Sequence, residues 1–174
     1  HIEDKLAAVT AQSPGLRHYI CATEQEKELV WNLRKAGLSL LVGCPGSAKP
    51  TAGIEDVAVP PRQLPAYVDA LRGVMDKLDL RVSFYGHAAS GLLHVRPVLD
   101  LHSARDIQKF RQVADEVSAL AKQFNGSLTA EHGVGIARTE YVSAHVGVAL
   151  LDTMRLVKRA FDPAAMMNPG KIFD

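Results

Sequence analysis

Hydrophobic periodicity divides most of the chain into predicted helices. Apolar residues recur at three- and four-residue spacing over 64–78, which predicts a helix packed on one side, with Pro65 in its first turn. A second long amphipathic helix is expected from an N-cap at Ser103, which an acid follows three residues on, to Asn125-Gly126. The remaining predicted helices cover 1–12, 24–36 and 141–160.

Shorter apolar runs predict the strands of a small sheet. Candidates are 38–42, 54–59 and 127–130, and 43–53 is expected to be a loop because it is rich in glycine and proline. Two further runs within 81–97 flank a turn-prone stretch and predict a β-hairpin. Helices interleaved with these strands favour one α+β domain over 1–174, ferredoxin-like, with an antiparallel sheet and helices packed on one face.

The predicted hairpin carries two histidines. If its turn is centred between Ser90 and Gly91, His87 lies opposite His94 and Tyr85 lies opposite Arg96. These four side chains then share one face of the hairpin, because side chains alternate along a strand. Directly paired residues have Cβ atoms about 4.5–5.5 Å apart. Two imidazoles at that separation are close enough to share one metal ion.

A second polar motif, Glu131-His132, follows the strand candidate at 127–130 and precedes two glycines. With His87 and His94, Glu131 gives a His₂Glu set, the ligand number typical of catalytic zinc with an open position. The same donors also suit manganese, iron or cobalt. An open position would bind a substrate hydroxyl or carboxylate, and His132 beside it is a candidate general base, because imidazoles titrate near neutral pH.

Each of these residues also has a purely structural interpretation. Two histidines on a strand pair are often polar residues at a sheet edge, and Glu131-His132 also suits a helical turn with a satisfied acid. Arg34 on a helix is by default a solvated charge, and Lys49 in a glycine-proline loop is by default a surface residue. Arg96 is better placed than either to hold a carboxylate, because it follows the second hairpin histidine on the same face.

Composition and charge narrow the class of protein. The 174 residues carry a net charge of +1 with interspersed charges, which gives no electrostatic footprint for nucleic acid. No apolar run approaches the roughly 18 residues that span a bilayer, and no secretory signal stands near the first residue. Cys21 and Cys44 lack metal-ligand spacing, so we expect reduced thiols in a cytoplasmic protein. The opening His1-Ile-Glu predicts a piece of a longer chain.

Four stretches in sequence order resemble one family. The segment 85–97 resembles the Gly-His-x-Gly-Asp-Gly-Asn-Leu-His signature of FAD-linked oxidases, and 126–135 resembles their Gly-x-x-Ser-x-Glu-His-Gly-x-Gly. The segment 161–172 resembles their closing Phe-Asp-Pro…Asn-Pro-Gly-Lys, and 55–60 resembles the strand before their first long helix. The chain is therefore identified as similar to the vanillyl-alcohol oxidase/p-cresol methylhydroxylase family, while 1–54 matches only loosely.

This resemblance implies a function for the parent protein. Within the family the chain is similar to D-lactate, glycolate and D-2-hydroxyglutarate dehydrogenases, and its hairpin looks most like large bacterial members fused to an iron–sulfur domain. Such enzymes oxidise a 2-hydroxy acid to the 2-oxo acid and pass hydride to FAD. An N-terminal domain, absent here, mainly holds the FAD. The chain would be the C-terminal cap that binds substrate, inactive alone, in a cytoplasmic parent that associates peripherally with a membrane.

The resemblance also assigns roles residue by residue. Ser90 and Leu92 depart from the usual Asp and Asn of the hairpin signature, so hydrogen bonding in that loop must differ. By this resemblance His87, His94 and Glu131 are metal ligands, with zinc as the expected metal, and His132 is the base. Arg34, Arg96 and Lys49 bind the substrate carboxylate. Asn168 and Lys171 make contacts that face the flavin.

Two other functions remain open from the sequence. A stand-alone ferredoxin-like binding module without redox activity is compatible with a chain that lacks the flavin domain. A metal-dependent hydrolase is compatible with a His₂Glu set and water, although no second acid outside the cluster is evident.

Overall fold

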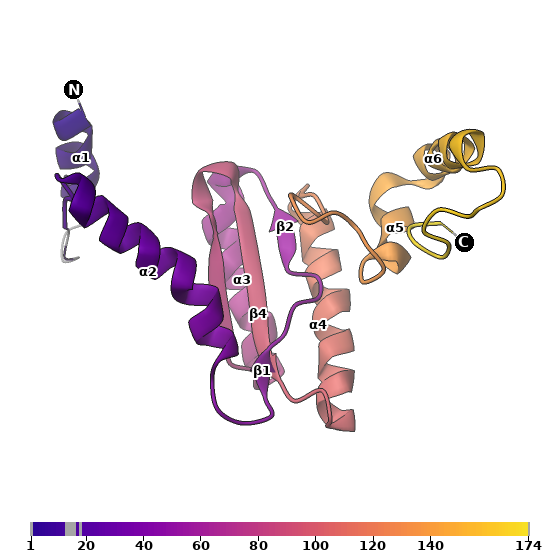
Figure 1. The fold of residues 1–174 in the computed structure, drawn as a ribbon, viewed down its shortest axis with the longest axis horizontal. Coiled ribbons are helices and arrows are strands. Elements are labelled where there is room, and N and C mark those ends of the chain that lie inside the picture. The colour runs from indigo at the N-terminus through magenta and orange to yellow at the C-terminus, as the bar shows by residue number, and fades with distance from the viewer. Residues whose placement is uncertain (1, 13–16, 18, 174) are drawn as a thin grey trace. The chain divides into compact units, whose positions relative to one another are not determined.

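The computed structural model describes residues 2–12, 17 and 19–173, so His1 of the first predicted helix lies outside the described part (Figure 1). The chain divides into two compact units, His1–Gly43 and Cys44–Asp174, and each is described by itself. The expectation of one domain over 1–174 stays a prediction.

The first unit contains two helices, α1 (Ile2–Ala11) and α2 (Glu24–Val42). A capping box opens α2. The hydroxyl of Thr23 accepts the N–H of Glu26 at 3.2 Å, and the Glu26 carboxylate accepts the N–H of Thr23 at 3.0 Å. These bonds satisfy two backbone donors that the first helical turn leaves without partners.

The strand predicted over 38–42 is wrong, because α2 continues through Gly37 as far as Val42. One glycine inside a helix costs about 1 kcal/mol, which is too little to end it, and a short apolar run does not distinguish strand from helix. The helix ends at Gly43, whose N–H donates to the carbonyl of Ser39 at 2.9 Å.

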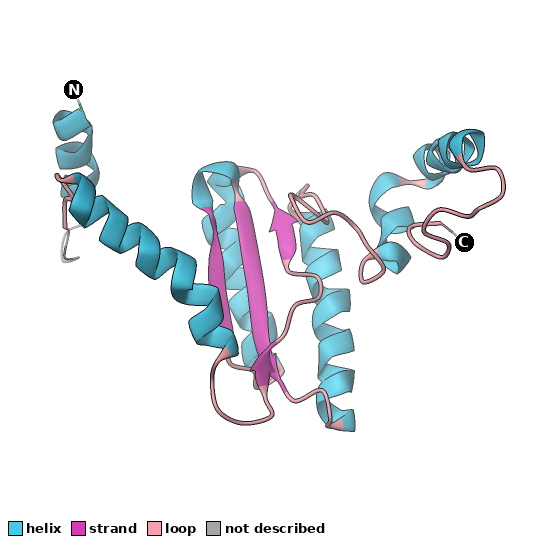
Figure 2. Ribbon diagram, viewed as in Figure 1, coloured by secondary structure: helices cyan, strands magenta, loops and turns pink. Residues whose placement is uncertain are grey.

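The second unit is built on an antiparallel sheet centred on β4 (Leu92–Leu99) (Figure 2). The strand β3 (Val82–His87) borders one edge of β4. On the other edge β4 pairs with β2 (Asp56–Ala58) and, further along, with β1 (Lys49–Pro50). The strand β1 lies within a predicted loop, and β2 is shorter than the predicted 54–59.

The connections give the ferredoxin-like order. The helix α3 (Leu64–Lys77) joins β2 to β3, and α4 (Ala104–Gln123) leads from β4 to Ser127. Ser127 forms an antiparallel bridge with Ala58 of β2, so the order across the sheet is Ser127, β2, β4, β3. This confirms the predicted α+β architecture. The predicted strand at 127–130 is reduced to that single bridge.

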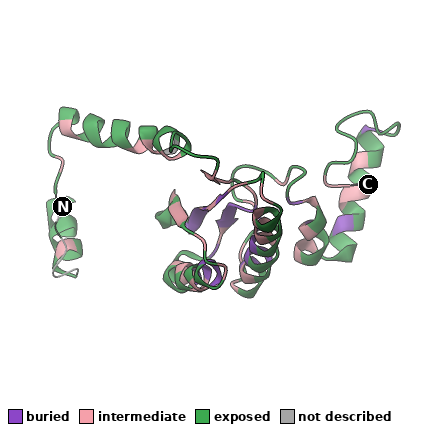
Figure 3. Ribbon diagram, turned by 90° about the horizontal axis from the view of Figure 1, so that it is seen from below, coloured by how far each residue is buried: buried purple, intermediate pink, exposed green. Residues whose placement is uncertain are grey.

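Both helices cover the same face of this sheet, as Figure 3 shows. Alternation along β2 and β4 turns apolar side chains to that face and polar ones to the other. Asp56 and His94 are register partners on the face away from the helices. The apolar core between sheet and helices includes Val57, Leu93, Val95, Tyr67, Leu71, Val113 and Val117.

The hairpin register differs from the predicted one by two residues. Tyr85 pairs with His94 and His87 with Leu92, so the direct pairs of His87 with His94 and of Tyr85 with Arg96 were wrong. The turn covers four residues and closes through the Gly91 N–H, which donates to the Ala88 carbonyl at 3.0 Å. Gly91 has φ +72°, and a Cβ there would lie 1.8 Å from the Val59 carbonyl oxygen. The histidines still share one face, as diagonal neighbours.

The helix predicted over 141–160 is interrupted. A 3₁₀ turn (Thr139–Tyr141) leads into α5 (Val142–Val146), and α6 (Val148–Phe161) follows after Gly147, whose φ of +78° breaks the helical path. The helix α6 ends at Phe161, one residue beyond the predicted end. The segment after it is not extended, because Asn168 and Gly170 adopt positive φ and produce turns.

None of the helices formed by the described residues is both long and apolar enough to cross a membrane.

Candidate active site

Polar side chains from three separated segments meet on the sheet face away from α3 and α4. Asp56 comes from β2, His87 and His94 from the hairpin, and Glu131 and His132 from the loop after α4. The structure therefore brings His94, Glu131 and the predicted base together, whereas the predicted ligand His87 lies beside them, outside the group of mutually close ligand atoms. It adds Asp56, which the sequence interpretation did not select.

His94 presents one ring nitrogen toward Glu131. Its Nδ1 lies 3.2 Å from the backbone carbonyl of Glu55, which can only accept, so Nδ1 carries the proton. In the neutral imidazole Nε2 then holds a lone pair, and it lies 3.0 Å from Oε1 of Glu131. A lone pair and a carboxylate oxygen at that distance need a proton or a cation between them.

The three histidines converge on the same carboxylate oxygen. Oε1 of Glu131 lies 3.0 Å from Nε2 of His94, 3.6 Å from Nε2 of His87 and 3.7 Å from Nε2 of His132. The rings of His94 and His132 stack at 4.9 Å between centroids. Mixed nitrogen and carboxylate donors of this kind fit zinc and neighbouring divalent ions.

The four residues Asp56, His94, Glu131 and His132 offer one ligand atom each within 4.8 Å of one another. Oδ1 of Asp56 is buried and has no hydrogen-bond partner among the described residues. A buried acceptor that lacks a partner is costly unless a cation or water satisfies it. The donor set suits a divalent metal, whereas Oδ1 of Asp56 lies 4.0 Å from Nδ1 of both His94 and His132, on the side of the rings away from Glu131.

Asp56 also holds the loop that carries Glu131 and His132. Its Oδ2 accepts the Thr129 hydroxyl at 2.8 Å and the backbone N–H groups of Ala130, Glu131 and His132 at 2.9, 3.0 and 2.8 Å. Burial alone would raise the pKa of the Asp56 carboxyl, but these four donors lower it below its ordinary value. The ionised carboxylate thus fixes the backbone of residues 129–132, which we call the site loop.

A second buried acid, Glu55, lies behind the base. Its Oε1 is 2.7 Å from Nδ1 of His132 and 3.7 Å from the guanidinium of Arg138, and its Oε2 is 3.6 Å from that of Arg96. The sequence interpretation did not select Glu55 or Arg138 for the site. An acidic pair opening an otherwise apolar strand was the signal that could have indicated Glu55 and Asp56.

The three predicted carboxylate-binding residues occupy different places. Arg96 lies beside the cluster, through its approach to Glu55. Lys49 begins β1, pairs with Leu99 at the far end of β4 from His94, and its Nζ donates to the Cys44 carbonyl. Arg34 belongs to α2 in the first unit, where its guanidinium lies 5.3 Å from the Trp31 ring centroid.

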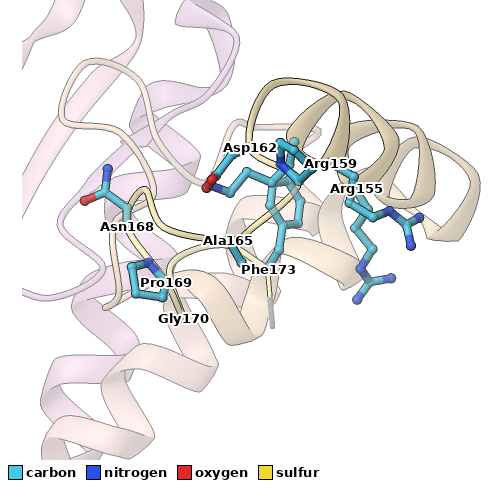
Figure 4. Close-up of a pocket in the computed structure, with 10 residues that line it drawn as sticks. Arg155, Arg159, Asp162, Ala165, Asn168, Pro169, Gly170 and Phe173 are labelled. Carbon is cyan, nitrogen blue, oxygen red and sulfur yellow. The ribbon is translucent and has the colours of Figure 1, made fainter.

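The predicted flavin-facing residues line a pocket near the site loop. Asn168 and Lys171 border a pocket of about 620 Å³ together with Gly135 and Ile136, which follow Glu131-His132 in sequence. The Ile172 N–H donates to the Thr139 hydroxyl at 3.0 Å and ties the tail to this loop. Figure 4 shows Asn168 across a neighbouring pocket from Asp162 and the arginines of α6.

Comparison with known proteins identifies the family. Residues 1–172 match the model of the FAD linked oxidases, C-terminal domain. The chain belongs to this family. The predicted resemblance is thereby confirmed, including the segment 1–54 that matched only loosely by motif.

Relatives with assigned names share much of this chain. It is 39% identical over 165 residues to a D-2-hydroxyglutarate dehydrogenase of Pantoea ananatis, covering 94% of this chain and 16% of that protein. It is 34% identical over 172 residues to D-lactate dehydrogenase [cytochrome] 1, mitochondrial, of Saccharomyces cerevisiae, and 29% identical over 170 residues to glycolate oxidase subunit GlcD of Bacillus subtilis. Each match covers 98% of this chain, and respectively 29% and 35% of the relative.

Proposed function

We propose that this chain is the substrate-binding and catalytic cap of an FAD-dependent D-2-hydroxyacid dehydrogenase. The observation that carries the proposal is the convergence of three imidazole Nε2 atoms on Oε1 of Glu131, in a domain of the FAD-linked oxidases. The reaction is oxidation of a 2-hydroxy acid to the 2-oxo acid. The names of its relatives favour D-2-hydroxyglutarate, D-lactate and glycolate as candidate substrates.

In this proposal His87, His94 and Glu131 hold a divalent metal, and zinc suits their donors. A metal bound there would act as a Lewis acid on the substrate's hydroxyl oxygen and make its proton easier to remove. The Nδ1–H contact with Glu55 keeps Nε2 of His132 unprotonated in the neutral ring, as a base requires. His132 would accept the hydroxyl proton, and FAD held by the parent protein would supply the hydride acceptor.

The remaining predicted residues position the substrate and the cofactor. Arg96 lies beside the histidine cluster and suits a substrate carboxylate, a role proposed also for Arg34 and Lys49 from the family resemblance. Asn168 and Lys171 line a pocket that also contains Lys158, a set of donors that suits an anionic part of FAD.

The parent protein supplies the rest of the proposed enzyme. The chain spans 16% of the Pantoea relative, which leaves room for an N-terminal FAD-binding domain and an iron–sulfur domain. A cytoplasmic location with peripheral membrane association belongs to the same proposal. The relatives give no support to a stand-alone interaction module.

The test uses the full-length parent with its flavin. We expect one of the three candidate acids to bleach the flavin absorbance under anaerobic conditions, and a chelator or Glu131→Gln to slow this reduction by about a hundredfold or more while FAD stays bound. Glu140→Gln, which removes an exposed acid paired with Arg111, is the matched control and should leave the rate unchanged. Undiminished reduction in the metal-free protein would contradict the metal assignment.

A further inference from the structure

Glu55 is a buried acid that the proposed reaction does not yet use. Only 5% of its surface is exposed, and β4 holds its backbone: its carbonyl accepts the Val95 N–H at 3.3 Å and Nδ1–H of His94 at 3.2 Å. Because the backbone of Glu55 is held by these bonds and its side chain is buried, its carboxylate has little freedom to move and stays behind the cluster.

The two oxygens of the carboxylate face different neighbours. Oε1 faces the base, at 2.7 Å from Nδ1 of His132, while Oε2 lies 3.4 Å from Nδ1 of His94 and 3.6 Å from Arg96. Of these contacts, the one to His132 is a hydrogen bond of the length typical of charge-assisted pairs. The guanidinium groups of Arg96 and Arg138 complement the buried negative charge.

This hydrogen bond determines which nitrogen of His132 is available. A carboxylate accepts and does not donate, so the shared proton resides on Nδ1 and the lone pair of the neutral ring resides on Nε2. That nitrogen lies on the Glu131 side, and 43% of the His132 side chain is exposed. The lone pair therefore lies on the Glu131 side of the ring, opposite the nitrogen that Glu55 holds.

We propose that Glu55 is a positioning residue for His132, which fixes its tautomer and ring orientation for proton abstraction. The inference rests on the proposed function. In the balanced step, the substrate hydroxyl proton passes to Nε2, the hydride on the same carbon passes to the oxidised flavin, and the carbinol becomes a carbonyl. Glu55 exchanges no proton in this step and acts only through the His132 ring.

A different role would be charge compensation, in which Glu55 only neutralises Arg96 and Arg138. Two substitutions separate the roles. Glu55→Gln removes the charge but keeps an oxygen that accepts Nδ1–H, whereas Glu55→Leu removes both at similar size. Positioning predicts that Gln retains much of the rate that Leu loses, and charge compensation predicts equal losses.

The experiment measures single-turnover flavin reduction in the full-length flavoprotein, together with metal per flavin, affinity for the 2-oxo acid product and thermal unfolding. We expect Glu55→Leu to slow reduction by about 10- to 100-fold at unchanged metal content, with Glu55→Gln between it and the wild type. Product affinity should change less than the rate. Val117→Ala, a core truncation on α4, is the control for lost stability and should reduce its flavin normally.

The inference would be overturned if Glu55→Leu and Glu55→Gln lost the same share of the rate of flavin reduction, or if the rate fell in proportion to the metal content. It would also be overturned if Val117→Ala slowed flavin reduction as much as Glu55→Leu does, or if the Glu55→Leu rate lay within twofold of the wild-type rate. If Glu55→Leu does not accumulate, Glu55→Gln decides, since a rate close to that of the wild type supports the inference and a rate as low as that of His132→Ala overturns it. Absence of flavin reduction in the wild type, or full reduction in His132→Ala, would instead refute the proposed function.

Discussion

Two aspartates hold the two loops that matter for the proposed site, and they do so in contrasting surroundings. Asp56, fully buried in β2, collects three backbone N–H groups of the loop that carries Glu131 and His132. Asp162, at the end of α6, collects the N–H groups of Met166 and Met167 at 2.9 Å each. The same device therefore fixes the loop of the proposed site and the tail.

The difference lies in what packs around each aspartate. The sheet and helices around Asp56 form a closed apolar core, in which α4 buries Val113, Val117, Ser118 and Ala121. Of the residues of α6, Leu151 alone is buried by the described part of the chain. Phe161 and Met166, on either side of Asp162, are each 80% exposed. The site loop is supported by tertiary packing, whereas the tail depends on local hydrogen bonds.

The largest expected effect is a difference in the free energy of unfolding between core substitutions on α3 and surface substitutions on α6. Leu71→Ala on α3 removes a fully buried side chain and should lower the free energy of unfolding by about 3 kcal/mol. Leu156→Ala on α6, where the side chain is 62% exposed, should change it by less than about 0.5 kcal/mol. Urea denaturation of the chain, followed by circular dichroism, measures both. Equal losses would show that α6 is packed as well as α3.

The next effect compares the two aspartates. Asp56→Asn weakens four hydrogen bonds to a buried carboxylate and should cost about 2 kcal/mol at neutral pH. Asp162→Asn should cost less, because Asp162 is 6% exposed whereas Asp56 is fully buried, and because Phe161 and Met166 beside Asp162 are 80% exposed. Both carboxyls have a lowered pKa, Asp162 through the Lys158 ammonium and the Met167 N–H.

The sign of the pH dependence follows from these lowered pKa values. The stabilisation is complete above the ordinary aspartate pKa of about 3.9 and is lost as the pH falls through the lower value of the folded state. Denaturation between neutral pH and acid should therefore show a steeper acid limb for wild type than for Asp56→Asn. Parallel limbs would contradict the stated role of Asp56.

The smallest effect concerns His145, which joins α5 to α4 through Ser118 at 3.1 Å. Burial lowers the pKa of His145, and the charge of Lys122 adds to this, against the opposing hydrogen bond with Ser118. Folding then favours the neutral ring, so stability falls as the pH drops below about 6.5 toward the folded pKa. His145→Gln should flatten the unfolding free energy over this range, and an unchanged slope would exclude the histidine as its source.

Local signals in the sequence predicted much of the fold. The periodicity of α3 and α4 and the cap at Ser103 depend on neighbouring residues alone, and the structure confirms them. The errors arose where distant contacts or backbone conformation decide. The continuation of α2 past Gly37, the break at Gly147 and the two-residue shift in hairpin register leave no mark in hydrophobic spacing.

The site was predictable to a similar extent. The histidines and Glu131 belong to motifs whose residues stand close together in sequence, so the set could be assembled before the structure. Glu55, Asp56 and Arg138 escaped because their importance rests on bonds across about 75 residues, such as Asp56 to Glu131 and Glu55 to His132. An acid in an apolar strand reveals its partner only when the chain is folded.

The central position of β4 has a consequence for quality control during folding. This strand pairs with β1, β2 and β3, and it turns Leu93 and Val95 to the core while turning His94 to the site. A slip of one residue would exchange the two faces. The imidazole would then enter the apolar core and a leucine would take its place in the proposed site. A misregistered molecule would therefore lose its core and the proposed site in the same event, so proteolysis of unstable chains would also remove those in which the site is disrupted.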